Sequence, residues 1–165
     1  LFVRSEAFWK AGALDEDFFA HQEEIDLCWR MNNLDYQVVS IPSSVVYHVG
    51  GGSLSYGNAR KTYLNFRNNL MMMFKNLPMG ELIWKMFFRM ILDGLAAVNS
   101  VIKTKKTDDL VAIFKAHMSF YTNLPLLWQK RKRVLKKSSS KLFNQSIVWQ
   151  YFIRGKKKFS ELESF

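Results

Sequence analysis

The chain has 165 residues, 48% of them hydrophobic and 15% aromatic, which excludes an intrinsically disordered protein and suits one domain with a core. Its net charge of +10 is divided unevenly. Residues 1–60 carry four basic and eight acidic side chains (net −4), and residues 61–165 carry twenty basic and six acidic ones (net +14). This asymmetry predicts an acidic part suited to proton or metal chemistry and a basic part suited to an anionic surface.

The single cysteine, Cys28, excludes an internal disulfide, and we expect it to pack on the apolar side of a helix. The sequence starts at Leu1, without a methionine, on an apolar LFVR segment typical of an interior strand. We therefore expect the chain to be part of a longer protein whose N-terminal portion is missing.

The first part of the chain is predicted to mix short strands with helices. Strands are expected at 1–4, 37–41 and 45–49, where β-branched residues cluster. Helices are expected at 5–10 and 22–34 from capping residues and apolar spacing.

The second part is predicted to be helical. The expected segments are helices at 58–76, 81–102 and 108–137 and a short aromatic segment at 142–153. In the second helix Lys85, Arg89 and Asp93 recur every four residues on one face, whereas the other faces are strongly apolar. Three charges argue against a spanning helix, which needs ~20 mostly apolar residues. A helix at a membrane interface and a helix packed in a bundle both fit this pattern.

Carboxylates cluster just before the helix predicted at 22–34. Glu23, Glu24 and Asp26 fall within four residues, and such groups either favour the positive end of a helix or serve in proton transfer. Downstream, His48 precedes a run of glycines. Neutral imidazole is a common metal ligand and glycine lets the backbone approach a phosphate, although a lone histidine at a strand end is more often structural.

Four motifs follow one another along the first half of the chain. They are R-x-E-A-F-x-x-A-G-x-L-D-E-D-F-F at 4–19, EEIDLCWR at 23–30, VVYHVGGGS at 45–53 and RKTYLNFRNN at 60–69. In this order and spacing they resemble the C-terminal half of a family 2 glycosyltransferase of the bacterial rhamnosyltransferase-like type. The resemblance covers residues 1–78 and extends more loosely into the helical tail.

The resemblance implies an α/β fold. Residues 1–77 are expected to be the acceptor-side part of a GT-A glycosyltransferase domain, without its nucleotide-binding half, and residues 78–165 a mainly helical, basic region. The implied activity is inverting transfer of a sugar from a nucleotide-sugar donor to a saccharide or lipid-linked acceptor in bacterial surface polysaccharide synthesis. The fragment alone is expected to be inactive, because the metal motif and nucleotide pocket belong to the missing half.

The resemblance also implies roles for individual residues. Glu24 stands where the family usually has aspartate and is the expected general base, with Asp26 as the second candidate and Glu23 in an orienting or capping role. His48 is implied to touch a divalent metal, Mg²⁺ or Mn²⁺, bound mainly by the missing half. The further donor or acceptor contacts expected are Asp15, Glu16, Trp29, Arg30, Gly50, Gly51, Arg60 and Arg67.

The basic tail is expected to meet an anionic membrane surface, because aromatic and basic residues together favour the headgroup level. The residues expected there are Lys85, Arg89, Lys130, Arg131, Lys132 and Arg133. A solvated helical face ranks second and nucleic acid third, so no nucleic-acid partner is expected. The protein is accordingly predicted to be cytoplasmic and peripheral on the inner face of the plasma membrane, released as salt rises. The competing function is a non-catalytic basic helical module that binds a membrane surface or nucleic acid.

Overall fold

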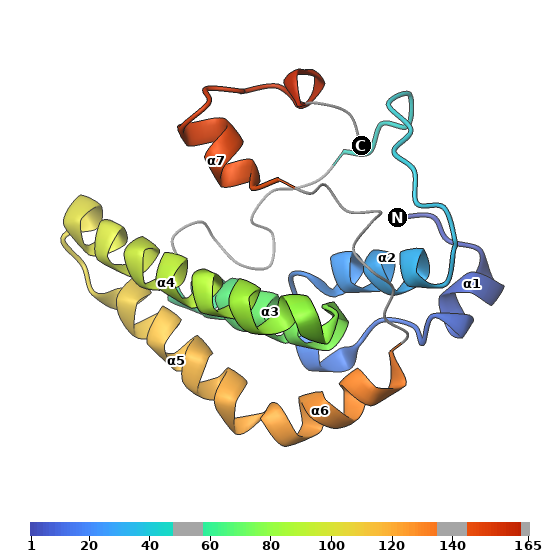
Figure 1. Ribbon diagram of the computed structural model, residues 1–165, viewed down its shortest axis with the longest axis horizontal. Helices are drawn as coiled ribbons and strands as arrows, with labels where there is room; N and C mark the ends of the chain where they lie inside the picture. The colour runs from blue at the N-terminus through green and yellow to red at the C-terminus, as the bar shows by residue number, and fades with distance from the viewer. Residues whose placement is uncertain (48–57, 135–144, 163–165) are drawn as a thin grey trace.

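The computed structural model describes residues 1–47, 58–134 and 145–162, and these residues are organised around helices (Figure 1). In chain order the elements are α1 (Ser5–Lys10), η1 (Glu16–Phe18), α2 (Glu23–Asn33), α3 (Ala59–Asn76), α4 (Met79–Thr104), α5 (Asp108–Thr122), α6 (Leu124–Arg133), α7 (Ile147–Phe152) and η3 (Phe159–Glu161). The helices predicted at 5–10, 22–34, 58–76 and 81–102 are confirmed to within two residues at each end.

The predicted α/β class is wrong, because none of the described residues forms a β-strand. The segments at 1–4 and 37–47 lie outside any helix and have no strand partner in the described part of the chain. Their β-branched side chains, including Val39, Val45 and Val46, are exposed. Such residues favour strands because they pack well on a pleated surface, and the described residues offer no sheet to pack on. His48 and Val49, predicted to end the second of these strands, lie outside the described residues.

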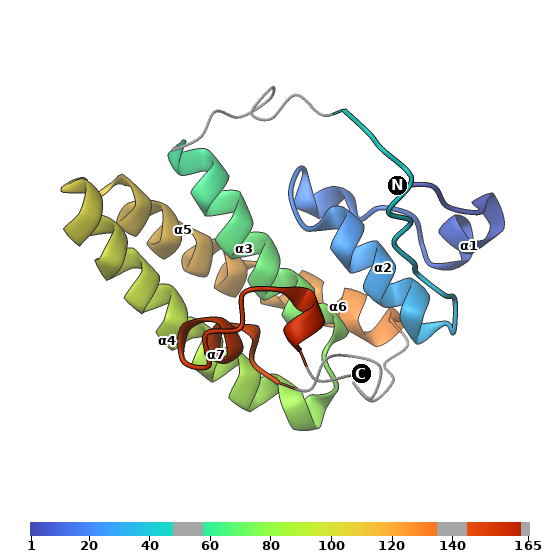
Figure 2. The same cartoon turned by 90° about the horizontal axis from the view of Figure 1, so that it is seen from above.

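The main core forms where α3 meets α4, α5 and α6 (Figure 2). Leu70 and Leu77 from α3 and its C-terminus pack with Met86 of α4, Phe120 of α5 and Leu127 of α6. Phe18, from the short η1 helix, is also part of this cluster. The core therefore crosses the domain boundary predicted at 77/78. It joins the helical tail to residues 13–22, the segment with Asp15, Glu16 and Asp17 that we call the acidic loop.

A smaller core supports the acidic loop from the other side. Ala7 and Ala11 of the α1 segment pack on Leu27 and Met31 of α2. Because Leu27 and Met31 are four residues apart, they share one face of α2. The opposite end of α2 begins at Glu23, directly after the loop.

The single helix predicted at 108–137 is wrong, because α5 ends at Thr122 and α6 starts at Leu124. The reason is Pro125, which occupies the first turn of α6 and has no N–H to continue the hydrogen-bond ladder of α5. The break turns α6 back toward α3, so that its basic C-terminal end meets the acidic loop.

Candidate functional site

A buried carboxylate fixes the start of α2 to α3. Asp26 is fully buried. Its Oδ2 accepts hydrogen bonds from Arg30 Nε at 2.9 Å and Lys75 Nζ at 2.7 Å, and its Oδ1 accepts one from Asn76 Nδ2 at 2.7 Å. Arg30 in turn donates to the carbonyl oxygens of Ala11 and Ala13. Both oxygens of Asp26 are thus engaged, so Asp26 anchors the fold and is not placed to take up a proton from a substrate.

A second carboxylate extends this network to the basic tail. Asp15 accepts from Lys75 at 2.7 Å and from Lys130 at 2.5 Å, and Lys130 also bonds Asp17 at 2.5 Å. Burial opposes ionisation of Asp15, but the hydrogen bonds from Lys130 and Lys75 outweigh it and lower the pKa of Asp15 to about 2. The acidic loop and the tail are therefore joined by ion pairs.

Two side chains of α3 hold the loop that leads to α2. Arg67 donates to the carbonyl oxygens of Asp17 and Phe18 at 2.8 and 3.1 Å. The buried Asn68 donates from its amide nitrogen to the carbonyl oxygens of Phe18, Ala20 and His21 at 2.7–2.9 Å, while its oxygen accepts from Arg67 Nε. Almost every carbonyl from 17 to 21 is thereby fixed from one helix.

The loop so held has a strained backbone. Phe19, His21 and Gln22 all have positive φ, at 61°, 70° and 75°, a region that costs a non-glycine residue about 1–3 kcal/mol. At Phe19 the pair φ 61°, ψ −57° and the hydrogen bond from the Ala20 nitrogen to the Phe18 oxygen, 2.7 Å long, define a classic γ-turn. Strain of this kind persists only where the surroundings over-determine it, as Arg67 and Asn68 do here.

The three carboxylates predicted to carry chemistry have different surroundings. Both oxygens of Asp26 accept hydrogen bonds in the buried network, whereas Glu24 is exposed and has no partner among the described residues. Glu23 is half-buried, and its Oε2 has no hydrogen-bond partner there; the same holds for His21 Nε2 in the preceding turn. Glu24 is therefore the one member of the three that a ligand can reach without breaking the fold.

Other predicted contact residues are distributed around this centre. Arg30 and Arg67 are internal clamps, Trp29 packs half-buried against the main core, and Glu16 is exposed on η1. Arg60 places its guanidinium 5.2 Å from the centre of the Phe19 ring. The predicted positions His48, Gly50 and Gly51 lie outside the described residues.

The described residues do not fit a divalent metal. No group of three His, Cys, Asp or Glu side chains in the described ranges is placed to hold one. Asp15, Asp17 and Asp26 are each paired with a lysine or arginine, which removes them as ligands. The metal implied by the resemblance stays a prediction that concerns His48 and residues beyond this chain.

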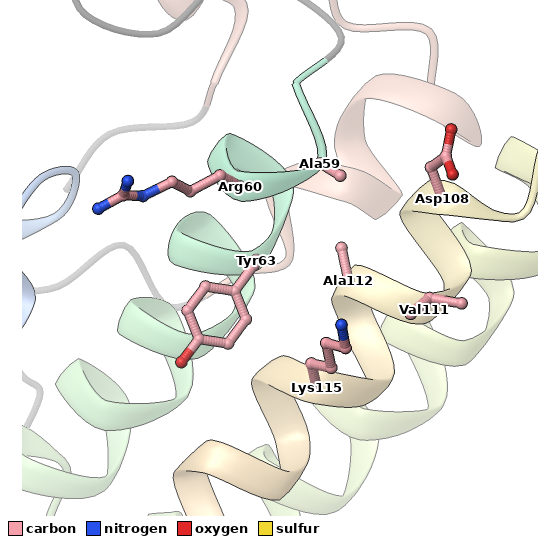
Figure 3. Close-up of a pocket in the computed structure, with 7 residues that line it drawn as sticks. All are labelled: Ala59, Arg60, Tyr63, Asp108, Val111, Ala112 and Lys115. Carbon is pink, nitrogen blue, oxygen red and sulfur yellow. The ribbon is translucent and has the colours of Figure 1, made fainter.

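A cavity of about 410 Å³ lies between α3 and α5, lined by Arg60, Tyr63, Asp108, Lys115 and small apolar residues. Its charged groups do not converge: Figure 3 shows Arg60 extending away from Lys115 and Asp108. Burial opposes ionisation of Tyr63, but hydrogen bonds with Ser119 and Arg67 outweigh it and lower the pKa of the phenol. The cavity is thus linked through Tyr63 to Arg67, one of the two side chains that hold the loop before α2, and forms no separate charged site.

The basic residues predicted to face a membrane divide into two groups. Lys130 is paired with the acidic loop, and Arg131 is buried, with its guanidinium over the Phe74 ring and donating to the Phe74 carbonyl. Lys132 and Arg133 are exposed. On α4, Lys85 pairs with Glu81, and Arg89 pairs with Asp93 at 2.7 Å.

The polar stripe of α4 lies at the edge of its contact with the rest of the protein: Lys85 and Arg89 are partly exposed, whereas Asp93 is buried. Asp93 is buried and also lies 3.1 Å from His117 of α5. The opposite side of α4, which we call the outer face, carries exposed large apolar residues: Ile83, Trp84, Phe87, Phe88, Ile91, Leu92, Leu95, Val98 and Ile102. Exposed apolar residues of α5, such as Leu110 and Phe114, border an apolar groove between the two helices. Within the described ranges, no helix combines the length and apolarity needed to cross a bilayer.

Sequence reasoning did not single out the side chains that build the site: Phe19, Asn68, Lys75 and Asn76. One signal was available, because Asn68, Lys75 and Asn76 are polar residues on the otherwise apolar inner face of a helix, and polar groups at such positions are buried only with partners. Neither a family model nor a curated protein nor a solved structure matches this chain.

Proposed function

We propose that the chain carries the catalytic base of an inverting glycosyltransferase that uses a nucleotide-sugar donor, and that the base is Glu24. One observation carries the proposal: of the three neighbouring carboxylates, Glu24 alone is exposed and unpaired among the described residues. It lies on a helix that the hydrogen bonds of Asp26 with Lys75 and Asn76 hold against α3. The resemblance to family 2 glycosyltransferases supplies the reaction class. The exposure of Glu24 and the burial of Asp26 support Glu24 over Asp26 as that base.

In this mechanism the Glu24 carboxylate accepts the proton of an acceptor hydroxyl as that oxygen attacks the anomeric carbon. The bond from that carbon to the diphosphate breaks on the opposite side, so the configuration inverts. A base must be within hydrogen-bond reach of the proton it takes, and the clamped loop and anchored helix fix where the carboxylate stands. Asp26 contributes as a positioning residue, because it holds the first turn of α2 to α3.

The test is glycosyl transfer by the protein with a panel of UDP- and dTDP-sugars and a lipid-linked saccharide acceptor, together with the nucleotide-binding half if that half is encoded upstream. Glu24→Gln is expected to lower kcat by roughly 10²–10⁴-fold while donor binding changes little. Glu6→Gln, an exposed glutamate on α1, is the matched control and should retain full activity. Transfer that persists in Glu24→Gln, or no transfer by the unsubstituted protein with any donor, would contradict the proposal.

We also propose that the protein is peripheral on the cytoplasmic face of a membrane, with the outer face of α4 as the contact. The occupant is an anionic lipid bilayer. The outer face is apolar along the length of α4, and exposed Lys103, Lys105 and Lys106 follow at its C-terminal end. An apolar face bordered by cations suits insertion at the headgroup level beside anionic lipids. Because Lys130 and Arg131 are used inside the fold, the polybasic run is not the main contact.

Vesicle co-sedimentation tests this contact with phosphatidylcholine vesicles containing or lacking about one third phosphatidylglycerol. Each buried apolar side chain contributes about 1.5–3 kcal/mol, so Phe87→Gln with Ile91→Gln should weaken binding at least tenfold. The matched control, Val39→Gln with Ile41→Gln, removes equally exposed apolar residues elsewhere and should bind normally. The release by salt expected from the sequence assumed a contact through the polybasic run, whose Lys130 and Arg131 are used inside the fold. For the apolar contact proposed here, binding should instead largely survive high salt, since screening acts on charges only. Failure to bind anionic vesicles, or a dimer in solution that the α4 variant abolishes, would reject the bilayer as occupant.

A further inference from the structure

Phe18 and Phe19 are adjacent aromatic residues, of which the first is buried and the second exposed. Phe18 is 1% exposed and packs in the main core, with Lys75 Nζ 4.9 Å from its ring centre. Phe19 is 71% exposed. Burying the large apolar area of an aromatic ring stabilises the folded state. The exposed ring of Phe19 does not contribute this stabilisation, whereas the buried ring of Phe18 does.

The γ-turn at Phe19 is the device that separates the two rings. The turn reverses the chain at Phe19 and presents its side chain to the outside, at a backbone geometry that glycine would adopt without strain. Six hydrogen bonds involve the carbonyls of residues 17–21: five from Arg67 and Asn68, and the bond that closes the turn. The buried amide of Asn68 and the half-buried guanidinium of Arg67 thus hold an exposed phenylalanine in a strained conformation.

The surroundings of the displayed ring are polar and lead to the proposed base. Arg60 lies over the Phe19 ring at 5.2 Å from its centre, and Figure 3 shows this side chain leaving the α3–α5 cavity. Five residues beyond Phe19 comes the exposed Glu24. An exposed aromatic face with a guanidinium over it and an exposed carboxylate shortly after it in the chain suits a ligand with one apolar and one hydroxylated side.

We infer that Phe19 is a stacking platform for a pyranose ring of the acceptor, with Arg60 holding the platform and Asn68 as its positioning residue. A pyranose presents C–H bonds, which are slightly positive, on one face and hydroxyls around its edge. The C–H face packs on the negative face of the phenyl ring, and the edge hydroxyls stay free to meet exposed polar groups such as the Glu24 carboxylate. This inference rests on the proposed function, since it places the acceptor sugar beside Glu24.

Two substitutions at position 19 test whether Phe19 binds a sugar ring or serves only in packing. Phe19→Gly removes the ring and relaxes the turn, so it should raise the Tm by about 2–4 °C while raising the acceptor KM at least tenfold and leaving the donor KM unchanged. Phe19→Trp keeps an aromatic face and should retain the acceptor KM within about threefold. Phe114→Ala, which removes an exposed phenylalanine of α5, is the matched control and should not alter the acceptor KM.

Binding can be measured apart from turnover. Aromatic NMR signals of Phe19, assigned by their loss in Phe19→Gly, should shift saturably when the protein is titrated with methyl pyranosides of glucose, galactose, rhamnose and N-acetylglucosamine, and the Phe114 signals should not. A Phe19→Gly protein that is less stable than the parent, or that keeps the acceptor KM, would overturn the platform, as would the absence of any pyranoside-induced shift. If instead pyranosides bind at Phe19 but Glu24→Gln transfers sugar normally, the platform stands and the assignment of the base fails.

Discussion

Asp26 and Asp93 are two buried carboxylates built alike and used differently. Each lies on a helix and pairs with an arginine four residues away, Arg30 for Asp26 and Arg89 for Asp93. Asp26 adds Lys75 and Asn76 from α3, whereas Asp93 adds His117 from α5. The Lys75 side chain is 3% exposed, and that of Arg89 is 31% exposed.

The partners of the two carboxylates differ in how many elements they join and in how deeply they are buried. Around Asp26, buried cations and an amide join α2 and α3 and, through Asp15, the loop and α6. Around Asp93, a partly exposed arginine and a histidine join α4 to α5 alone. The first network therefore holds Asp15 and the helix that carries Glu24 to α3. The second leaves α4 with its apolar outer face toward solvent.

The largest effect should come from removing the charge of Asp26. Asp26→Asn leaves Arg30 and Lys75 buried beside a neutral amide, and breaking a buried ion pair in this way costs about 3–5 kcal/mol. Urea unfolding measures the loss of free energy of unfolding. Glu24→Gln, two residues earlier on the same helix and exposed, is the control and should unfold like the parent. If the two variants proved equally stable, Asp26 would not be the anchor described here.

A smaller loss is expected at the second carboxylate. In Asp93→Asn the partly exposed Arg89 can turn to solvent, so the cost should be about 1–3 kcal/mol, that of a buried hydrogen-bonded group. The same urea experiment, with Asp93→Asn and Asp26→Asn side by side, ranks the two networks. A loss at Asp93 equal to that at Asp26 would remove the distinction between them.

The sequence predicted the helices well because their signals are local. Asn58 caps α3 by accepting from the Arg60 backbone nitrogen, and the apolar repeats of α2, α3 and α4 set their extent. The break at 123 was also readable from Pro125, which the prediction of one helix at 108–137 did not take into account. The strands were predicted wrongly because β-branched composition at 37–47 does not supply a partner strand.

The site was predictable in part. Motif order pointed to Glu24, and the structure separates it from Asp26 by burial, which no spacing rule specifies. The roles of Lys75 and Lys130 depend on pairs 60 and 115 residues apart in the chain. The conformation at Phe19 depends on Arg67 and Asn68 of α3. Long-range partners of this kind are fixed by packing and have no local signature.

The smallest effect concerns Asp15, the link between the two parts of the chain. Its pKa is lowered from 3.8 to about 2, so the folded state binds this proton less readily than the unfolded state. The resulting stabilisation is complete above about pH 4 and is lost as the pH falls toward 2, and it amounts to at most about 2 kcal/mol.

The measurement is the difference in free energy of unfolding between the parent and Asp15→Asn, followed from pH 5 to pH 2. The difference should shrink to a small part of its value at pH 5, because at pH 2 Asp15 is protonated in nearly all of the unfolded parent and in about half of the folded parent. Glu6→Gln, which alters an exposed glutamate, should show no such trend. A difference that stays constant with pH would mean that Lys75 and Lys130 do not stabilise the Asp15 carboxylate, and that the tail is held to the loop by the Lys130–Asp17 pair and the apolar contacts of Phe18 and Leu127.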